Sequence, residues 1–185
     1  MKLIDKVIRY WRTKVALNYS PQKMQSVLDI GCDDGYLLKR LDSSAKRKEG
    51  VDPKLSENVS LAGIKLWSGY FPGVIKQHQI QGSYDAIFAL AVFEHFSDDD
   101  LISSAQEINN ILSSKGKLII TVPHPFVDKI LDVLLFLRVI DGQAVEEHHG
   151  FEPEQLKNVF NKHLVLLEHK KFQFGLNNIF VFVRK

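Results

Sequence analysis

The stretch VLDIGCDDG, Val27–Gly35, contains the turn that decides the fold. Its first four residues form a short, largely apolar run that is typical of a buried parallel strand. Gly31 and Gly35 then supply a tight turn, which three leucines at helical spacing follow: Leu37, Leu38 and Leu41. A strand, a glycine turn and a helix in this order bring backbone N–H groups and the positive end of a helix dipole together. The stretch therefore predicts a cofactor-binding elbow.

Two carboxylates accompany this turn. Asp29 lies within the predicted strand, where it can brace the turn or accept a hydrogen from a ligand's ammonium group. Asp52 follows Gly35 by 17 positions, at the carboxyl end of a second predicted strand, 47–51. An exposed carboxylate at that point can accept hydrogen bonds from both hydroxyls of a ribose. The two motifs together favour a cofactor that contains a nucleoside.

Strand-like and helix-like runs alternate through the rest of the chain, which is the pattern of a largely parallel sheet. Helical spacing and capping residues predict further helices at about 3–13, after Ser97 as far as Leu112, and from Pro153. Apolar runs predict further strands near 64–67, 84–90, 117–122, 164–167 and 179–183. The sequence thus predicts a doubly wound α/β fold.

Five motifs together resemble those of class I S-adenosylmethionine-dependent methyltransferases, in particular the members that act on small molecules. They are VLDIGCDDG, GVDP at 50–53, YDAIFALAVFEH at 84–95, LSSKGKLIITVP at 112–123 and EHHGFEPEQL at 147–156. The resemblance covers the chain from about Val27 to its C-terminus. It implies a Rossmann-like, mostly parallel seven-stranded sheet with helices on both faces and a C-terminal antiparallel strand. It also implies a single domain, 1–185, with an N-terminal helix within 1–20 and a lid-like helix and loop at 124–150.

The same resemblance implies S-adenosylmethionine as the cofactor and S-adenosylhomocysteine as the product. Carried over position by position, it assigns cofactor contacts to Asp29, Gly31, Cys32, Asp33, Gly35, Asp52, Pro53, Leu90 and Ala91. The family usually has glycine at the position of Asp33. Aspartate tolerates a left-handed backbone better than most residues. Its carboxylate could pair with the cofactor's ammonium group or repel the cofactor's carboxylate.

Methyl transfer from a sulfonium mainly requires alignment of the acceptor with a methyl group that is already activated, so no metal is expected. The expected acceptor is a hydroxyl oxygen of a small molecule. His149, favoured over its neighbour His148, is the predicted proton acceptor, and His95 is the other candidate catalytic residue. Each could instead be structural, with His95 orienting its loop and His149 forming hydrogen bonds in a solvated loop.

Composition and charge set the expectations about partners and location. The 185 residues carry a net charge of +2 and no basic stripe that could follow a phosphate backbone, so nucleic acid is not an expected partner. The single cysteine, Cys32, and the lack of a recognisable export signal predict a cytoplasmic protein. The apolar segment 126–140 is too short to span a membrane. It could be core, a lid, a homodimer face or a seat for a lipid-like substrate.

Two other functions stay open at this point. A nicotinamide-dependent oxidoreductase would use a similar sheet, but its fingerprint needs glycines where this chain has Asp33 and Tyr36. A protein that binds S-adenosylmethionine without catalysis is the other alternative, because Asp33 is unusual and the segment between Asp52 and Tyr84 is compressed. Binding of each cofactor and turnover on an acceptor would separate the three.

Overall fold

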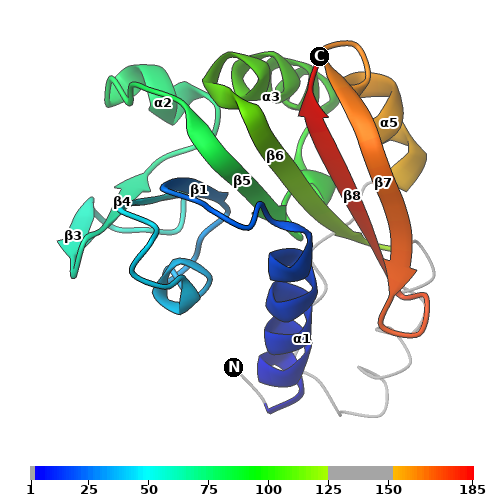
Figure 1. Ribbon diagram of the computed structural model, residues 1–185, viewed down its shortest axis with the longest axis horizontal. Coiled ribbons are helices and arrows are strands. Elements are labelled where there is room, and N and C mark those ends of the chain that lie inside the picture. The colour runs from blue at the N-terminus through cyan, green and yellow to red at the C-terminus, as the bar shows by residue number, and fades with distance from the viewer. Residues whose placement is uncertain (1–2, 125–151) are drawn as a thin grey trace.

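The computed structural model describes residues 3–124 and 152–185. The apolar segment 126–140, most of the predicted lid and His149 therefore lie outside the described residues. Within the described residues, eight strands form one sheet in the order β3-β4-β2-β1-β5-β6-β8-β7 (Figure 1). The bounds are β1 Ser26–Ile30, β2 Arg47–Asp52, β3 Val59–Leu61, β4 Ile64–Ser68, β5 Tyr84–Leu90, β6 Leu112–Pro123, β7 Leu164–Phe172 and β8 Asn177–Arg184.

Parallel pairing joins β4, β2, β1, β5 and β6, while β8 pairs antiparallel with both β6 and β7. This arrangement confirms the predicted mostly parallel sheet with a C-terminal antiparallel strand. From β1 the chain adds β2 and then β4 on one side of β1. It then crosses back and adds β5 and β6 on the other side of β1. The switch point of the topology, where open α/β sheets bind their ligands, thus lies between β1 and β5.

The edge strand β3 is additional to the seven strands that were predicted. Its three residues are all exposed and pair antiparallel with β4. The connecting turn consists of Ala62 and Gly63, whose φ angles of 50° and 77° suit a two-residue hairpin. A strand without a buried face shows no hydrophobic alternation, so the sequence pattern could not reveal it.

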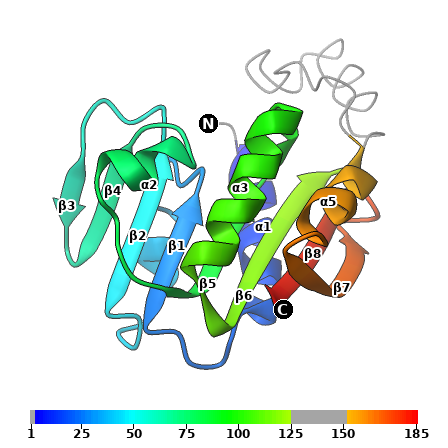
Figure 2. The same ribbon diagram turned by 90° about the horizontal axis from the view of Figure 1, so that it is seen from above.

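Helices cover both faces of the sheet (Figures 1 and 2). One face carries α1, which packs on β5 and β6, and the other carries α2, α3 and α5. Ser97 caps α3 as predicted, because its Oγ accepts a hydrogen bond from the Asp100 N–H at 3.2 Å. No helix among the described residues is long and apolar enough to cross a bilayer. The bounds are α1 Leu3–Tyr19, α2 Gly73–Gln77, α3 Asp98–Ile111 and α5 Pro153–Phe160.

Side chains of β1 alternate between the two faces of the sheet. Leu28 and Ile30 join the hydrophobic layer beneath α3, whereas Val27 joins the layer beneath α1. Asp29 is two positions after Val27 in the strand, so its side chain points to the same face of the sheet, the one that carries α1. A carboxyl group thus occupies a buried position on a central strand of the sheet.

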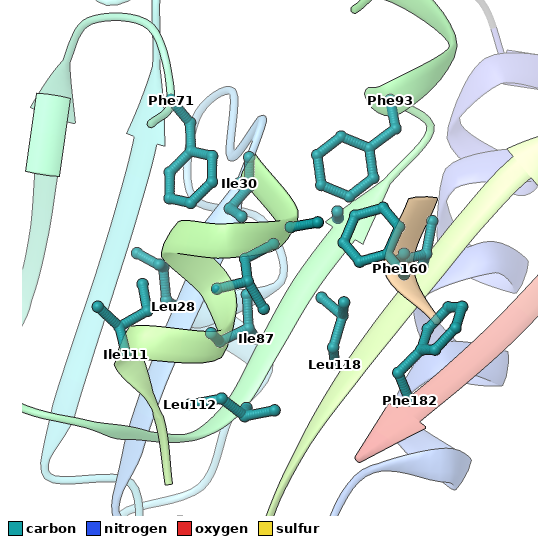
Figure 3. Packing of buried hydrophobic residues seen from close by; sticks show 14 of the residues in the cluster. Leu28, Ile30, Phe71, Ile87, Phe93, Ile111, Leu112, Leu118, Phe160 and Phe182 are labelled. Carbon is teal, nitrogen blue, oxygen red and sulfur yellow. The ribbon is translucent and has the colours of Figure 1, made fainter. Parts of the chain in front are cut away.

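An aromatic row strengthens the layer beneath α3 (Figure 3). The ring centroids of Phe93 and Phe160 are 5.4 Å apart, as are those of Phe160 and Phe182. All three side chains are fully buried, and ring pairs at this spacing attract each other beyond their loss of exposed area. The row joins the loop after β5 to α5 and β8.

The helix that was predicted after Gly35 is reduced to the single 3₁₀ turn η1, Leu38–Arg40. The Leu41 N–H donates to the carbonyl three residues earlier at 3.3 Å, and Leu41 is already extended. The chain then turns, because Asp42 Oδ1 accepts a hydrogen bond from the Ser44 backbone N–H at 2.8 Å. The predicted helix dipole at the glycine turn is therefore wrong, because a single 3₁₀ turn has no long row of aligned peptide dipoles.

Gly50 of β2 allows Cys32 to pack closely over the sheet. A Cβ at Gly50 would lie 2.6 Å from Cys32 Sγ and 2.9 Å from a methyl group of Leu66. We therefore expect Gly50→Ala to lower the free energy of unfolding by about 2 kcal/mol, as measured by urea denaturation. Gly73→Ala, where the added Cβ meets open space, is the control and should cost less than about 0.5 kcal/mol. Equal losses would contradict the proposed crowding.

Candidate cofactor-binding site

A cavity of about 940 Å³ lies at the carboxyl ends of β1, β2, β4 and β5, around the switch point of the sheet. Its volume is at the upper end of the range of small-molecule sites. The described residues that line it come from these strand ends, their loops, α1 and α3. They are Asp5, Ile30, Gly31, Asp33, Val51, Asp52, Pro53, Lys54, Gly69, Tyr70, Phe71, Ala91, Val92, His95, Phe96 and Asp100.

Gly31 lines the cavity at the turn that follows β1. Its φ of 74° lies in the left-handed region, and a Cβ on it would stand 2.8 Å from Val92 Cγ2. The N–H groups of Gly31 and Cys32 donate to the Val51 carbonyl at 2.9 and 3.2 Å, which ties the turn to β2. Glycine is therefore required at this position both by the left-handed backbone and by the close approach of the Val92 side chain.

Asp52 is buried, with 7% of its surface exposed, which corrects the prediction of an exposed carboxylate. Its Oδ2 accepts a hydrogen bond from the Asp33 N–H and its Oδ1 accepts one from the Lys54 N–H, both at 2.8 Å. The carboxylate thus aligns the loops after β1 and β2. Each carboxylate oxygen can accept more than one hydrogen bond, so Asp52 keeps the capacity to bind ribose hydroxyls at the cavity.

Asp33 adopts the left-handed backbone that its sequence position suggested, with a φ of 49°. Its side chain is 68% exposed, and its Oδ2 lies 3.3 Å from Nη1 of Arg9 on α1. Asp34 forms a second ion pair with the same guanidinium. The carboxylate of Asp33 therefore faces a cation, which weakens its repulsion of a second anion nearby.

Asp29 is almost completely buried on the α1 side of β1, with 4% of its surface exposed. Burial raises the pKa of Asp29 to about 8, while the Arg9 guanidinium opposes the rise and the Asp52 carboxylate adds to it. Asp29 thus holds its proton at neutral pH. An approaching cation such as an ammonium group would favour the ionised form and release that proton.

Five of the predicted cofactor contacts line the cavity: Gly31, Asp33, Asp52, Pro53 and Ala91. Four others do not belong to its described lining: Asp29, Cys32, Gly35 and Leu90. Cys32 packs on Gly50 with 3% exposure, and burial raises the pKa of its thiol. The Gly35 N–H closes the turn onto the Cys32 carbonyl at 2.8 Å. Cys32 and Gly35 thus shape the turn without belonging to the described lining of the cavity.

His95 ends η2, Phe93–His95, the 3₁₀ turn that follows β5. Its side chain is exposed at the cavity, and its N–H donates to the Val92 carbonyl at 3.1 Å. Two residues earlier, Phe93 fixes the turn in the aromatic row. His95 is the histidine that lines the cavity within the described part of the chain, whereas His149 lies outside it.

The charged residues of α1 were not singled out from the sequence. Asp5, Arg9 and Arg12 follow one another at helical spacing and are half-buried, in line with the fully buried Ala16. Asp5 lines the cavity and Arg9 contacts Asp33, which also lines it. The sequence could have indicated this side of the helix, because Asp5, Arg9 and Arg12 lie at helical spacing with Ala16, a small residue suited to close packing on a sheet.

Comparison with known families gives a match to the family described as "Methyltransferase domain" over residues 3–163. The chain belongs to this methyltransferase family. The match includes α1 and all the strand-end loops that form the cavity. The predicted class, a methyltransferase that depends on S-adenosylmethionine, is confirmed at the level of the family.

Curated relatives match only part of their own length. The tRNA U34 carboxymethyltransferase of Shewanella baltica (strain OS155) is 28% identical over 122 residues, which is 60% of this chain and 36% of the relative. The enzyme of the same name from Vibrio atlanticus (strain LGP32) is 31% identical over 124 residues, or 60% of this chain and 37% of the relative. The chain thus spans little more than a third of these relatives.

A solved structure shares the fold over almost the whole chain. The N-methyltransferase NodS from Bradyrhizobium japonicum WM9, in complex with S-adenosyl-L-homocysteine, has a TM-score of 0.67 at 14% identity. The alignment covers 95% of this chain and 86% of NodS. At this identity the likeness confirms the Rossmann-like methyltransferase fold.

The curated relatives overturn one expectation. Nucleic acid was excluded as a partner because the chain lacks a basic stripe, yet the relatives are named for tRNA. The exclusion is therefore wrong. A net charge of +2 averages over the whole chain and does not describe the surface around one site.

The residues at the cavity fit S-adenosylmethionine. The turn at Gly31 and the carboxylate of Asp52 line the cavity together, at the ends of neighbouring parallel strands. Carboxylates dominate the charged lining, since Asp5, Asp33, Asp52 and Asp100 outnumber Lys54 among the described residues. An excess of negative charge suits a ligand that carries a positive sulfonium.

Proposed function

We propose that this chain transfers the methyl group of S-adenosylmethionine to a hydroxyl oxygen of a small-molecule acceptor. The observation that carries the proposal is the hydrogen bond from the Asp33 N–H to Asp52, which joins the glycine turn to the strand-end carboxylate at one cavity. Membership of the methyltransferase family supports the class of reaction. His95, an imidazole exposed at the same cavity, supports a hydroxyl acceptor, whose proton it can take.

When bound, the cofactor supplies a methyl group that is already activated on a sulfonium. Asp52 would hold the ribose hydroxyls, and the turn at Gly31 would border the methionine part. The loop 91–96 after β5 would position the acceptor. Alignment of this kind can contribute on the order of 7–11 kcal/mol at its upper limit, so positioning is the main task of these residues.

His95 is the proposed proton acceptor on the acceptor side. We expect His95→Ala to lower kcat on a hydroxyl acceptor about tenfold and to leave cofactor affinity almost unchanged. This effect lies below the range of a sequestered general base because water can replace an exposed imidazole. Initial rates and calorimetric affinities measure the two quantities, and His163→Ala, which lies outside the described cavity lining, is the control.

Equal losses of kcat and cofactor affinity in His95→Ala would instead indicate that His95 only orients its loop. His149 is the other predicted base. A loss of kcat in His149→Ala, with His95→Ala fully active, would transfer the role to His149.

A nucleoside within RNA is a second candidate acceptor, and the names of the curated relatives favour it. The two acceptors share the cofactor site and differ only in what reaches the loop after β5. Methyl-labelled S-adenosylmethionine, offered with a panel of small hydroxyl compounds or with bulk tRNA, separates them by where the label appears.

Calorimetric titration of the pure protein is the first experiment. S-adenosylmethionine and S-adenosylhomocysteine should bind, and NAD should not. Binding of NAD alone would favour the oxidoreductase alternative. Binding of S-adenosylmethionine without transfer to any acceptor would favour a non-catalytic binding protein. Failure of both S-adenosyl ligands to bind would overturn the proposed function.

A further inference from the structure

The exposed side of α1 is largely apolar in its first half. Val7, Tyr10 and Trp11 are 53%, 50% and 38% exposed. Residues three and four positions apart are neighbours on a helix surface, so these side chains adjoin one another. Ile8, three positions before Trp11, is 37% exposed beside them. A helix that only packs on a sheet has a polar outer side, so this half of α1 departs from the usual distribution.

Phe174 extends this apolar surface from the turn between β7 and β8. Its side chain is 93% exposed, and its ring meets that of Trp11 edge to face, with the centroids 5.7 Å apart. The preceding residue, Gln173, donates a hydrogen bond from Nε2 to the Ile8 carbonyl at 3.2 Å, which ties the turn to α1. The α1 patch, as we name it, consists of Val7, Ile8, Tyr10, Trp11 and Phe174.

The backbone of the turn is strained where it presents Phe174. The φ angles of Gln173 and Phe174 are 50° and 58°, in the left-handed region that a bulky aromatic residue rarely adopts. Strain of this kind is found most often at sites that bind or react. A large ring thus occupies an unfavourable backbone position without gaining burial. This combination indicates a role for Phe174 outside the core.

Cations surround the α1 patch. Lys6 and Lys14 lie four positions before and after Tyr10, so both adjoin its ring on the helix surface. Both lysines are exposed, and neither forms an ion pair with another residue that the structure describes. Cζ of Arg40 lies 6.0 Å from the ring centroid of Tyr10. The nearby carboxylate of Asp34 is already paired with a guanidinium of α1, so the rim of the patch is positive.

This composition fits a lipid surface. Tyrosine and tryptophan rings favour the boundary between water and hydrocarbon, and lysines beside them attract anionic headgroups. A nucleic-acid base would need ring faces on which to stack, and Val7 and Ile8 offer none. A stable dimer buries about 800 Å² on each partner, which is more than five partly exposed side chains provide.

We propose that the α1 patch docks this chain onto the surface of a membrane that contains anionic lipids. The inference goes beyond the proposed function and does not rest on it. The first half of α1 and the turn between β7 and β8 lie at the same end of the sheet (Figure 1). The cavity is at that end too, since Asp5 of α1 lines it. A docked chain would thus hold its cavity close to molecules that the membrane carries.

Co-sedimentation with vesicles tests the proposal. Vesicles of equal parts phosphatidylcholine and phosphatidylglycerol carry negative charge, and vesicles of phosphatidylcholine alone carry no net charge. The wild-type chain should partition at least about tenfold more strongly to the anionic vesicles, because their surface potential attracts Lys6 and Lys14. Added salt should reduce this difference, since it screens exposed charges.

Two variants separate the apolar contribution from the charged one. Phe174→Asn removes the ring and retains a residue that tolerates a left-handed backbone, so partition to both kinds of vesicle should weaken about tenfold. Lys6→Gln combined with Lys14→Gln should weaken partition to anionic vesicles about thirtyfold. The same double change should alter partition to phosphatidylcholine vesicles less than about threefold.

Matched controls lie elsewhere on the surface. Leu61 is 69% exposed on β3, at the opposite edge of the sheet from β7, and Leu61→Ser should leave partition unchanged. Lys46→Gln combined with Lys65→Gln removes two exposed charges away from the patch, and should change partition less than about threefold. The substituted positions are all exposed, so the variants should fold.

The proposal is supported if the Phe174 and lysine variants alone lose partition as described. It is overturned if the wild-type chain binds neither kind of vesicle, or if the Leu61 control loses as much as Phe174→Asn. Sedimentation velocity, with and without bulk tRNA, covers the other occupants. A dimer or a tRNA complex that Phe174→Asn abolishes, in a chain that does not bind vesicles, would overturn the proposal and assign the patch to a second copy or to RNA.

Discussion

Replacing Asp52 by alanine should weaken S-adenosylhomocysteine binding roughly a hundredfold or more. Hydrogen bonds to a charged group contribute about 1.5–3 kcal/mol each, and a ribose would lose two of them. The same change removes the acceptor for the Asp33 and Lys54 amides, so the two loops lose their alignment. Isothermal calorimetry measures the affinity, well below the melting temperature of the variant.

Two companion variants make this result specific. Asp52→Asn keeps the shape and one oxygen acceptor, so we expect a smaller loss of about tenfold. Glu57→Gln changes an exposed carboxylate that lies outside the described cavity lining, and should leave the affinity unchanged. An Asp52→Ala protein that binds as tightly as the wild type would remove Asp52 from the site.

Replacing Asp29 by asparagine should stabilise the ligand-free protein at neutral and alkaline pH. Burial is the main cause that raises the pKa of Asp29 from 3.8 to about 8. Between these values the folded state keeps a proton that the unfolded state has lost, so the free energy of unfolding falls as pH rises through this window. Asparagine imitates the protonated carboxyl and has no such penalty. We expect a gain of up to about 5 kcal/mol at pH 8 that vanishes towards pH 4.

Urea denaturation at several pH values measures this difference. Asp42→Asn is a control that should lower the free energy of unfolding at neutral pH, because hydrogen bonds from Ser44 lower the pKa of Asp42. Asp29→Asn should also bind S-adenosylhomocysteine more weakly, since a neutral amide is a poorer partner for an ammonium group. A stability gain that is independent of pH would mean that Asp29 is ionised in the folded protein.

Two local motifs of the sequence predicted that Gly31 and Asp52 lie near each other, and both line the cavity. The glycine turn at Gly31 and the carboxylate of Asp52 end neighbouring parallel strands, so geometry obliges them to meet at one edge of the sheet. Parallel strands place their carboxyl ends together whatever the loops between them do. Two short motifs were therefore enough to predict a cavity that many residues form.

Other parts of the site depend on contacts that no local pattern encodes. The buried carboxylate of Asp52 accepts hydrogen bonds from the backbone N–H groups of Asp33 and Lys54. Almost every residue has a backbone N–H group, so the sequence does not indicate which of them will donate to Asp52. The position of the charged side chains of α1 depends on which side of the helix faces the sheet. Helical spacing alone cannot decide that for a segment with both charged and apolar stripes. The exclusion of nucleic acid failed because whole-chain charge is an average.

The packing of Cys32 makes this protein convenient to label. Its thiol is the only one in the sequence, and it is buried with a raised pKa, so alkylating reagents that need a thiolate should scarcely react with it. A cysteine introduced at Phe174, which is 93% exposed and 5.7 Å from Trp11 between ring centroids, would then take a fluorophore at one defined place. Such a dye would sit beside the indole of α1 and could follow that helix through its fluorescence.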